Sequence, residues 1–144
     1  MAIAEHRTLH RALWVAQIVL AAAFFISGFI KVALPFDWVG AVLGWAKDQP
    51  EPVIRFIGVC ELFAVAGLLV PGLTRRLPSL IPVTAYALMG LMFCAIGFHT
   101  MKHQNSDVIL PLVLLVLSAF VAWGRSGFAP IEPVHRQKTA EAPR

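Results

Sequence analysis

Four ionisable side chains lie inside or at the ends of long apolar runs, where a charge needs a partner or a purpose. They are Lys31, Arg55, Glu61 and His99. Glu61 is the most informative, because it lies about eight residues, or roughly 12 Å of helix, inside its run and its short side chain cannot snorkel that far. The sequence therefore predicts that Glu61 pairs with Lys31 or Arg55, or handles a proton or a ligand.

The other three residues also have a purely structural interpretation. Lys31 and Arg55 can extend toward lipid head groups, and a single histidine at a helix end is commonly an interfacial residue. Lys31 shares a helix face with Ser27 and Gly28, small residues that let a neighbouring helix approach closely. Both interpretations of the polar residues stay open at this point.

Two cysteines, Cys60 and Cys94, fall at similar depth in separate apolar runs, without a C-x-x-C motif. They are either a redox pair or two small buried hydrophobic side chains. They give no signal for a redox compartment.

Histidines recur at i, i+4 spacing in His6 and His10 and again in His99 and His103. Such pairs can chelate a metal, but no carboxylate or thiolate stands in register with them, so no metal site is predicted. The chain also lacks a P-loop, a G-x-G-x-x-G motif and a G-x-S-x-G motif, and no catalytic residue is assigned.

The composition indicates which elements must position these residues. The 144 residues are 58% hydrophobic and only 14% charged, far more apolar than a soluble domain of this size. The net charge of +4 is not arranged as a basic stripe with interleaved aromatics, so nucleic-acid binding is not expected. The predicted partner is a lipid bilayer.

Four apolar runs cover residues 13–34, about 53–70, 79–98 and 108–123. Each approaches the length of a membrane-spanning helix. Pro35 ends the first run and Pro71 the second, while Pro82 and Pro111 fall in the first turns of the third and fourth. The predicted fold is an all-α integral membrane four-helix bundle, with an up-down-up-down topology.

The first run also has a basic start, but it is too long for a cleaved signal peptide and is interpreted as a retained span. Lysine and arginine predict the orientation, because cytoplasmic loops carry an excess of them. Eight lie on the side of the two termini and four on the other side. The prediction is a multi-pass protein of the inner (plasma) membrane with both termini in the cytoplasm. The up-down topology then brings Lys31, Arg55, Glu61 and His99 together in the outer half, and leaves the inner half without polar groups.

The segment between the first two spans has its own pattern. From Asp37, a good N-cap, Trp38, Val42 and Trp45 recur at helical spacing. This predicts a short interfacial helix, which either anchors the protein or places Trp38 and Trp45 as a lid over a site that opens outward.

The chain is predicted to divide into a transmembrane domain, residues 1–125, and a cytoplasmic disordered tail, residues 126–144, rich in proline and charge. The sequence does not fix the oligomeric state, although Gly90 and Gly97, seven residues apart, offer a small-residue contact face.

Five segments together resemble the DoxX-like family of small integral membrane proteins: SGFIK at 27–31, VIRFIGVCEL at 53–62, GLLVPGLTR at 67–75, His99, and FVAWGR at 120–125. The resemblance covers roughly residues 13–125. It implies a four-helix inner-membrane protein, and the family takes its name from a subunit of a quinone-linked thiosulfate oxidoreductase. Other members are associated with membrane redox or oxidative-stress assemblies, so the resemblance implies a redox setting without assigning a reaction.

Three functions follow as hypotheses. The leading one is a redox-associated, quinone-linked membrane subunit that binds a small amphipathic molecule in the outer half, with a quinone as the candidate cofactor. Lys31, Arg55 and His99 would donate hydrogen bonds to the ligand, and Glu61 would balance charge or relay a proton. The alternatives are a non-catalytic membrane scaffold for an oxidoreductase subunit, and a small transporter or proton pathway, which lacks the paired broken helices of inverted-repeat transporters.

Overall fold

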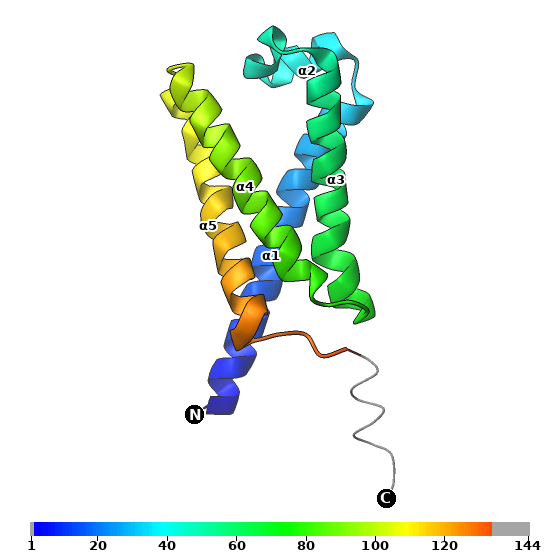
Figure 1. The fold of residues 1–144 in the computed structure, drawn as a ribbon, viewed down its shortest axis with the longest axis vertical. Coiled ribbons are helices and arrows are strands. Elements are labelled where there is room, and N and C mark those ends of the chain that lie inside the picture. Colours follow the sequence, from blue (N-terminus) through cyan, green and yellow to red (C-terminus); the bar gives the residue numbers. More distant parts are fainter. Residues whose placement is uncertain (1, 134–144) are drawn as a thin grey trace, which may run out of the picture.

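The computed structural model describes residues 2–133 of the chain. Four helices in this part are long and apolar enough to cross a membrane. They are α1 (Ala2–Ala33), α3 (Glu51–Thr74), α4 (Leu80–Met101) and α5 (Ile109–Trp123). Figure 1 shows that they run alternately up and down, so that α1 begins and α5 ends at the same end of the molecule. The predicted all-α, four-helix membrane bundle is confirmed.

The remaining elements are short. Between α1 and α3 lie α2 (Phe36–Val42) and the 3-10 turn η1 (Gly44–Asp48), which together form the predicted short helical segment. The 3-10 turn η2 (Asn105–Val108) connects α4 to α5, and the π-helical turn η3 (Gly124–Phe128) follows α5. The end of the bundle that carries α2 is called the α2 end below, and the opposite end is called the terminal end (Figure 1).

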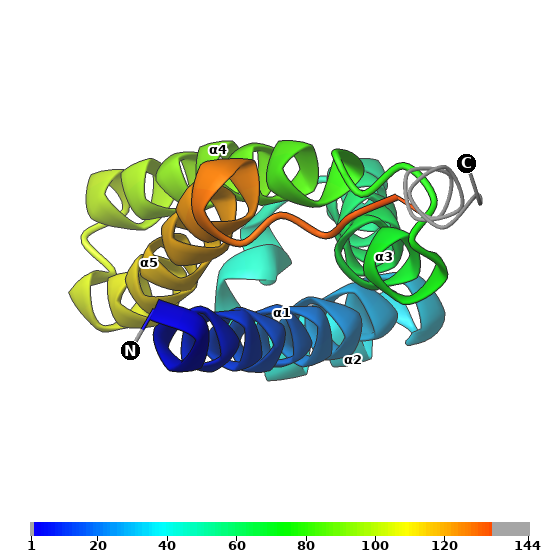
Figure 2. The same cartoon turned by 90° about the horizontal axis from the view of Figure 1, so that it is seen from below.

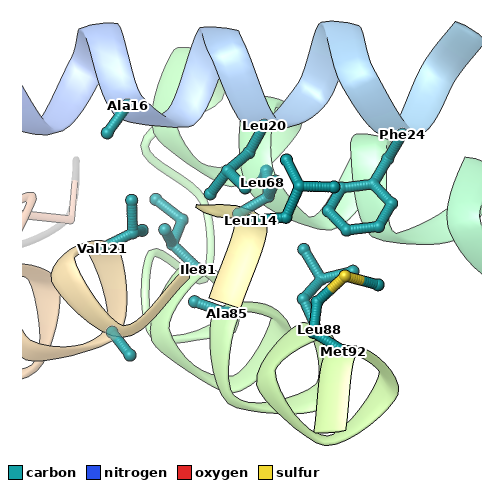
Figure 3. Close-up of a cluster of buried hydrophobic side chains, with 11 residues drawn as sticks. Ala16, Leu20, Phe24, Leu68, Ile81, Ala85, Leu88, Met92, Leu114 and Val121 are labelled. Atoms are coloured by element: carbon teal, nitrogen blue, oxygen red, sulfur yellow. The ribbon is translucent and has the colours of Figure 1, made fainter. Parts of the chain in front are cut away.

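The four helices pack as two pairs, α1 with α3 and α4 with α5. Figure 1 shows the pairs diverging toward the α2 end, and Figure 2 shows the same bundle from the terminal end. A thin apolar core joins the pairs (Figure 3), built around Phe24, Leu68, Leu88 and Val121. Outside this core, large apolar side chains are exposed on every long helix, which is expected where lipid is the solvent.

At the α2 end, α2 and η1 fold back over the ends of α1 and α3. Val39, Ala46 and Ile54 are fully buried there, and Trp45 is among the partly buried side chains that pack against them. This second apolar cluster fixes the position of η1, which matters because η1 carries Trp45 over the polar residues described below.

Two details of the helix boundaries differ from the sequence-based expectation. Pro35, and not Asp37, is the N-cap of α2, and no side chain caps that end. Pro71 does not end the second span, because α3 continues to Thr74 and stops at Arg75, whose φ of 53° is left-handed. A proline in the last helical turn removes only one backbone hydrogen bond, and the helix tolerates that loss here.

The predicted tail is partly packed. Of residues 126–144, the structure describes 126–133, and within these Ala129 is fully buried while Ile131 contacts the apolar core. Two residues of the predicted tail, Ala129 and Ile131, therefore pack against the bundle. The rest of the predicted tail lies outside the described residues.

Candidate functional site

The ion pair between Lys31 and Glu61 occupies the interface of α1 and α3 near the α2 end. Lys31 Nζ donates to Glu61 Oε1 at 2.6 Å and to Ser27 Oγ at 2.6 Å. The two charged side chains are only 4% and 5% exposed. Burial from solvent removes the hydration of both charges, so each depends on the other for its stability.

The backbones of α1 and α3 approach closely beside this ion pair. A Cβ on Gly58 would lie 2.7 Å from Lys31 Cβ and 3.1 Å from Gly28 O, while a Cβ on Gly28 would lie 2.9 Å from Gly58 O. Both distances under 3.0 Å are closer than real Cβ atoms come to their neighbours. The close approach predicted for the face of Ser27, Gly28 and Lys31 is therefore present, and glycine on both helices permits it.

Arg55 binds the end of α1 and contributes no group to the ion pair. Its Nη1 donates to Lys31 O at 2.6 Å, in the last turn of α1, and to Leu34 O at 2.8 Å, directly after the helix. Its Nε and Nη2 donate to Glu51 Oε1 at 3.1 and 2.9 Å. The guanidinium thus satisfies carbonyls that a helix C-terminus leaves without partners.

His99 reaches the same region from α4. Its Nδ1 lies 3.0 Å from Gln104 Oε1, which accepts when Nδ1 carries the hydrogen and leaves Nε2 as an acceptor. The Trp45 ring stands edge-on to the His99 ring with centroids 5.8 Å apart, and Lys31 Nζ lies 5.8 Å from the centroid of Trp45. Trp45 therefore connects the histidine to the ion pair. Lys31, Arg55, Glu61, His99 and Trp45 are called the Glu61 cluster below.

The structure places the other candidate residues elsewhere. Trp38 is 66% exposed on α2, so its side chain does not cover the Glu61 cluster as Trp45 does. Cys60 and Cys94 are free and exposed, without a disulfide between them. In the described part of the chain, no group of three histidine, cysteine or acidic residues could hold a metal ion. The side chain of His6 lies outside the described residues.

One atom of the Glu61 cluster lacks a partner. Glu61 Oε2 is buried and accepts no hydrogen bond from the described residues. A buried acceptor without a donor costs free energy comparable to a lost hydrogen bond, and more when the acceptor is charged. Glu61 Oε2 is therefore open to a hydrogen bond from an additional donor.

The terminal end carries a second polar group that sequence reasoning missed. Arg125 Nε donates to Gln17 Oε1 at 2.7 Å, and Gln17 Nε2 donates to Leu68 O at 2.8 Å. Gln17 is fully buried and Arg125 is 4% exposed. Arg125 Nη1 also lies 3.2 Å from His10 Nδ1. The prediction that the inner half carries no polar groups is wrong.

The signal for this second group was present in the sequence. Gln17 interrupts the first apolar run, and Arg125 directly follows the last one. An up-down topology brings the start of the first helix and the end of the fourth to the same level. Arg125 was counted only as an orienting charge, although the helix ends place it against α1.

Long apolar helices whose apolar side chains face outward, with polar groups buried between them, define a multi-pass integral membrane protein of the four-helix bundle class. Residues 15–121 of the chain match the model of the DoxX-like family, and the chain belongs to that family. No curated protein and no solved structure matches the chain significantly.

Proposed function

We propose that the Glu61 cluster binds the hydroxyl-bearing head group of a small amphipathic molecule, such as a quinol, in a redox-associated membrane subunit. The observation that carries the proposal is the buried, unpartnered Glu61 Oε2. A quinol hydroxyl can donate to this oxygen, whereas the carbonyl of the oxidised quinone cannot. The apolar surface of the bundle leaves room for the isoprenoid or alkyl part of the ligand in the surrounding lipid.

The hydrogen-bond roles differ from those in the sequence-based hypothesis, which had Lys31, Arg55 and His99 donate to the ligand. Lys31 already donates to Ser27 and Glu61, and Arg55 donates to backbone carbonyls of α1 and to Glu51. His99 Nδ1 faces Gln104. The proposal therefore assigns the ligand the role of donor, with Glu61 Oε2 as its acceptor and Trp45 as the side chain that covers it.

Mass spectrometry of the gently solubilised protein tests this proposal. Wild-type protein is expected to carry a lipid quinol or quinone, and Glu61→Gln to carry much less of it. Glu132→Gln is the matched control, because it is the same change at an exposed side chain at the opposite end of the bundle, away from the Glu61 cluster. A wild-type sample without any quinone-class molecule would sink the proposal.

A second candidate function is a non-catalytic scaffold that docks an oxidoreductase subunit. Lys31 and Arg55 of the Glu61 cluster already donate to groups of the protein itself, which favours a structural role for the cluster. A scaffold predicts that Glu61→Gln lowers the thermal stability in detergent without changing what co-purifies.

The orientation proposed for this subunit is an inner (plasma) membrane protein with both termini in the cytoplasm. It is supported by the eight lysine and arginine residues on the side of the termini against four on the other side. In that orientation the Glu61 cluster faces the outer half of the membrane. A C-terminal fusion to a reporter that is active only in the cytoplasm is expected to be active, and an inactive fusion would contradict the orientation.

A further inference from the structure

A cleft of about 210 Å³ lies at the terminal end, far from the Glu61 cluster. It is formed by the third and fourth turns of α1, the C-terminal end of α3 and the segment that follows η3. Its lining includes basic, acidic and apolar groups: His10, Trp14, Gly72, Arg75, Ile131 and Glu132. Trp14 also packs against Gly72, since a Cβ there would lie 2.8 Å from the indole ring.

Arg125 stands directly behind the wall of this cleft. Its guanidinium carbon lies 5.6 Å from the centroid of Trp14, and its Nη1 is 3.2 Å from His10 Nδ1 and 3.0 Å from Ala129 O. Its Nη2 is buried and has no hydrogen-bond partner among the described residues. No carboxylate in that part of the chain forms an ion pair with it. Within residues 2–133, the guanidinium is thus a buried cation without an anion.

Two nitrogen donors face the ring nitrogens of His10. Trp14 Nε1 donates to His10 Nε2 at 3.1 Å, while Arg125 Nη1 faces the other ring nitrogen. Indole and guanidinium nitrogens only donate, and a neutral imidazole offers one acceptor nitrogen, not two. Arg125 Nη2 is the nitrogen in this group that has no acceptor among the described residues, and an added group with acceptor oxygens can supply one.

We propose that this cleft binds a negatively charged phosphate group, which Arg125 and His10 hold while Trp14 and Ile131 contact the apolar part of the same molecule. The charges of guanidinium and phosphate are opposite, and the planar fork of the guanidinium can donate two hydrogen bonds to phosphate oxygens. Arginine is therefore a common phosphate ligand. The phosphate would approach Arg125 Nη2 by a small displacement of the His10 and Trp14 side chains.

Glu132 adds one carboxylate to the lining of the cleft and opposes an anion there. Its side chain is exposed, so water screens its charge, whereas Arg125 is 4% exposed and screened much less. The balance therefore favours the anion, and removal of the Glu132 charge is expected to strengthen its binding.

Native mass spectrometry of the full-length protein tests the proposal, with phosphatidylglycerol as the charged probe, phosphatidylcholine as the lipid without net charge, and inorganic phosphate as the soluble probe. Wild-type protein is expected to retain phosphatidylglycerol over phosphatidylcholine. Arg125→Gln is expected to weaken that retention about tenfold, the effect of losing one charge-assisted hydrogen bond. Arg76→Gln is the control, because it removes the same charge from an exposed side chain at the same end.

Glu132→Gln is the second variant, and because the side chain is exposed, this change is not expected to impair folding. It is expected to raise phosphatidylglycerol retention. Competition by inorganic phosphate would support a soluble phosphate compound as the natural ligand, and no competition would support a lipid head group. Retention that is the same in wild type, Arg125→Gln and Glu132→Gln, with no effect of inorganic phosphate, would overturn the proposal. If Arg125→Gln fails to fold, unchanged retention in Glu132→Gln alone overturns it.

Discussion

Replacement of Lys31 with methionine is expected to lower the free energy of unfolding by about 3 kcal/mol, because it leaves the Glu61 carboxylate buried without its cation. Lys31 and Glu61 are 2.6 Å apart and almost fully buried, so no water replaces the lost partner. Methionine keeps the length and apolar stem of lysine, which limits the change in packing. Unfolding in mixed detergent micelles measures the effect.

The double variant Lys31→Met with Glu61→Met tests whether the uncompensated charge of Glu61 causes the loss of stability. When both charges are removed together, no desolvated charge remains, and buried pairs replaced by apolar side chains are often neutral in stability. The double variant is therefore expected to recover most of the stability that Lys31→Met loses. If the double variant is as unstable as the single one, the ion pair is not the cause of the loss.

Replacement of Gly58 with alanine is the second change with a large expected effect, about 2 kcal/mol of lost stability. The added Cβ would meet Lys31 Cβ at 2.7 Å and Val32 Cγ2 at 2.9 Å, so α1 and α3 must move apart. This movement also displaces Lys31 from Glu61. Thermal unfolding in detergent and a loss of any ligand bound at Glu61 both report it.

Gly90→Ala is the matched control for Gly58→Ala. Gly90 lies inside α4, and a Cβ there would meet no atom within 4 Å. Alanine is the better helix former, so Gly90→Ala is expected to be neutral or slightly stabilising. Equal stability of the two variants would show that the close approach of α1 and α3 does not limit the packing. A Cβ at Gly90 or Gly97 would meet no atom within 4 Å in the described part of the chain, so the contact face predicted for these glycines stays a prediction.

Much of the fold could be predicted from the sequence, because the lipid environment strongly restricts the backbone structure of each span. Each span must satisfy its backbone within one helix, so hydrophobic runs such as residues 79–98 map directly onto helices such as α4 (Leu80–Met101). The gathering of Lys31, Arg55, Glu61 and His99 at one end follows from depth and chain direction. The exact partners do not follow, since Arg55 of α3 reaches the end of α1 beside Lys31 yet binds the backbone carbonyls of Lys31 and Leu34 and not Glu61.

The topology predicts that Gln17 and Arg125 lie at the same level, but their contact could not be predicted, because it depends on where the chain turns after α5. Residues 124–128 form a π-helical turn that brings Arg125 against Gln17 and returns Ala129 into the bundle. Composition alone assigned that segment to a solvated tail. The free oxygen of Glu61 also needed coordinates, since only they show that Lys31 satisfies one carboxylate oxygen and leaves the other without a donor.

The most direct test of the central claim, that Glu61 Oε2 accepts a hydrogen bond from a ligand hydroxyl, is a titration of the double variant Lys31→Met with Glu61→Met. A short-chain quinol is added to the wild-type protein and to the double variant in nanodiscs, and the tryptophan fluorescence is followed, with Trp45 as the reporter beside the cluster. The double variant is expected to stay folded and to bind the quinol at least about tenfold more weakly, because the acceptor is gone. Binding of the quinol by the folded double variant with wild-type affinity would contradict the claim.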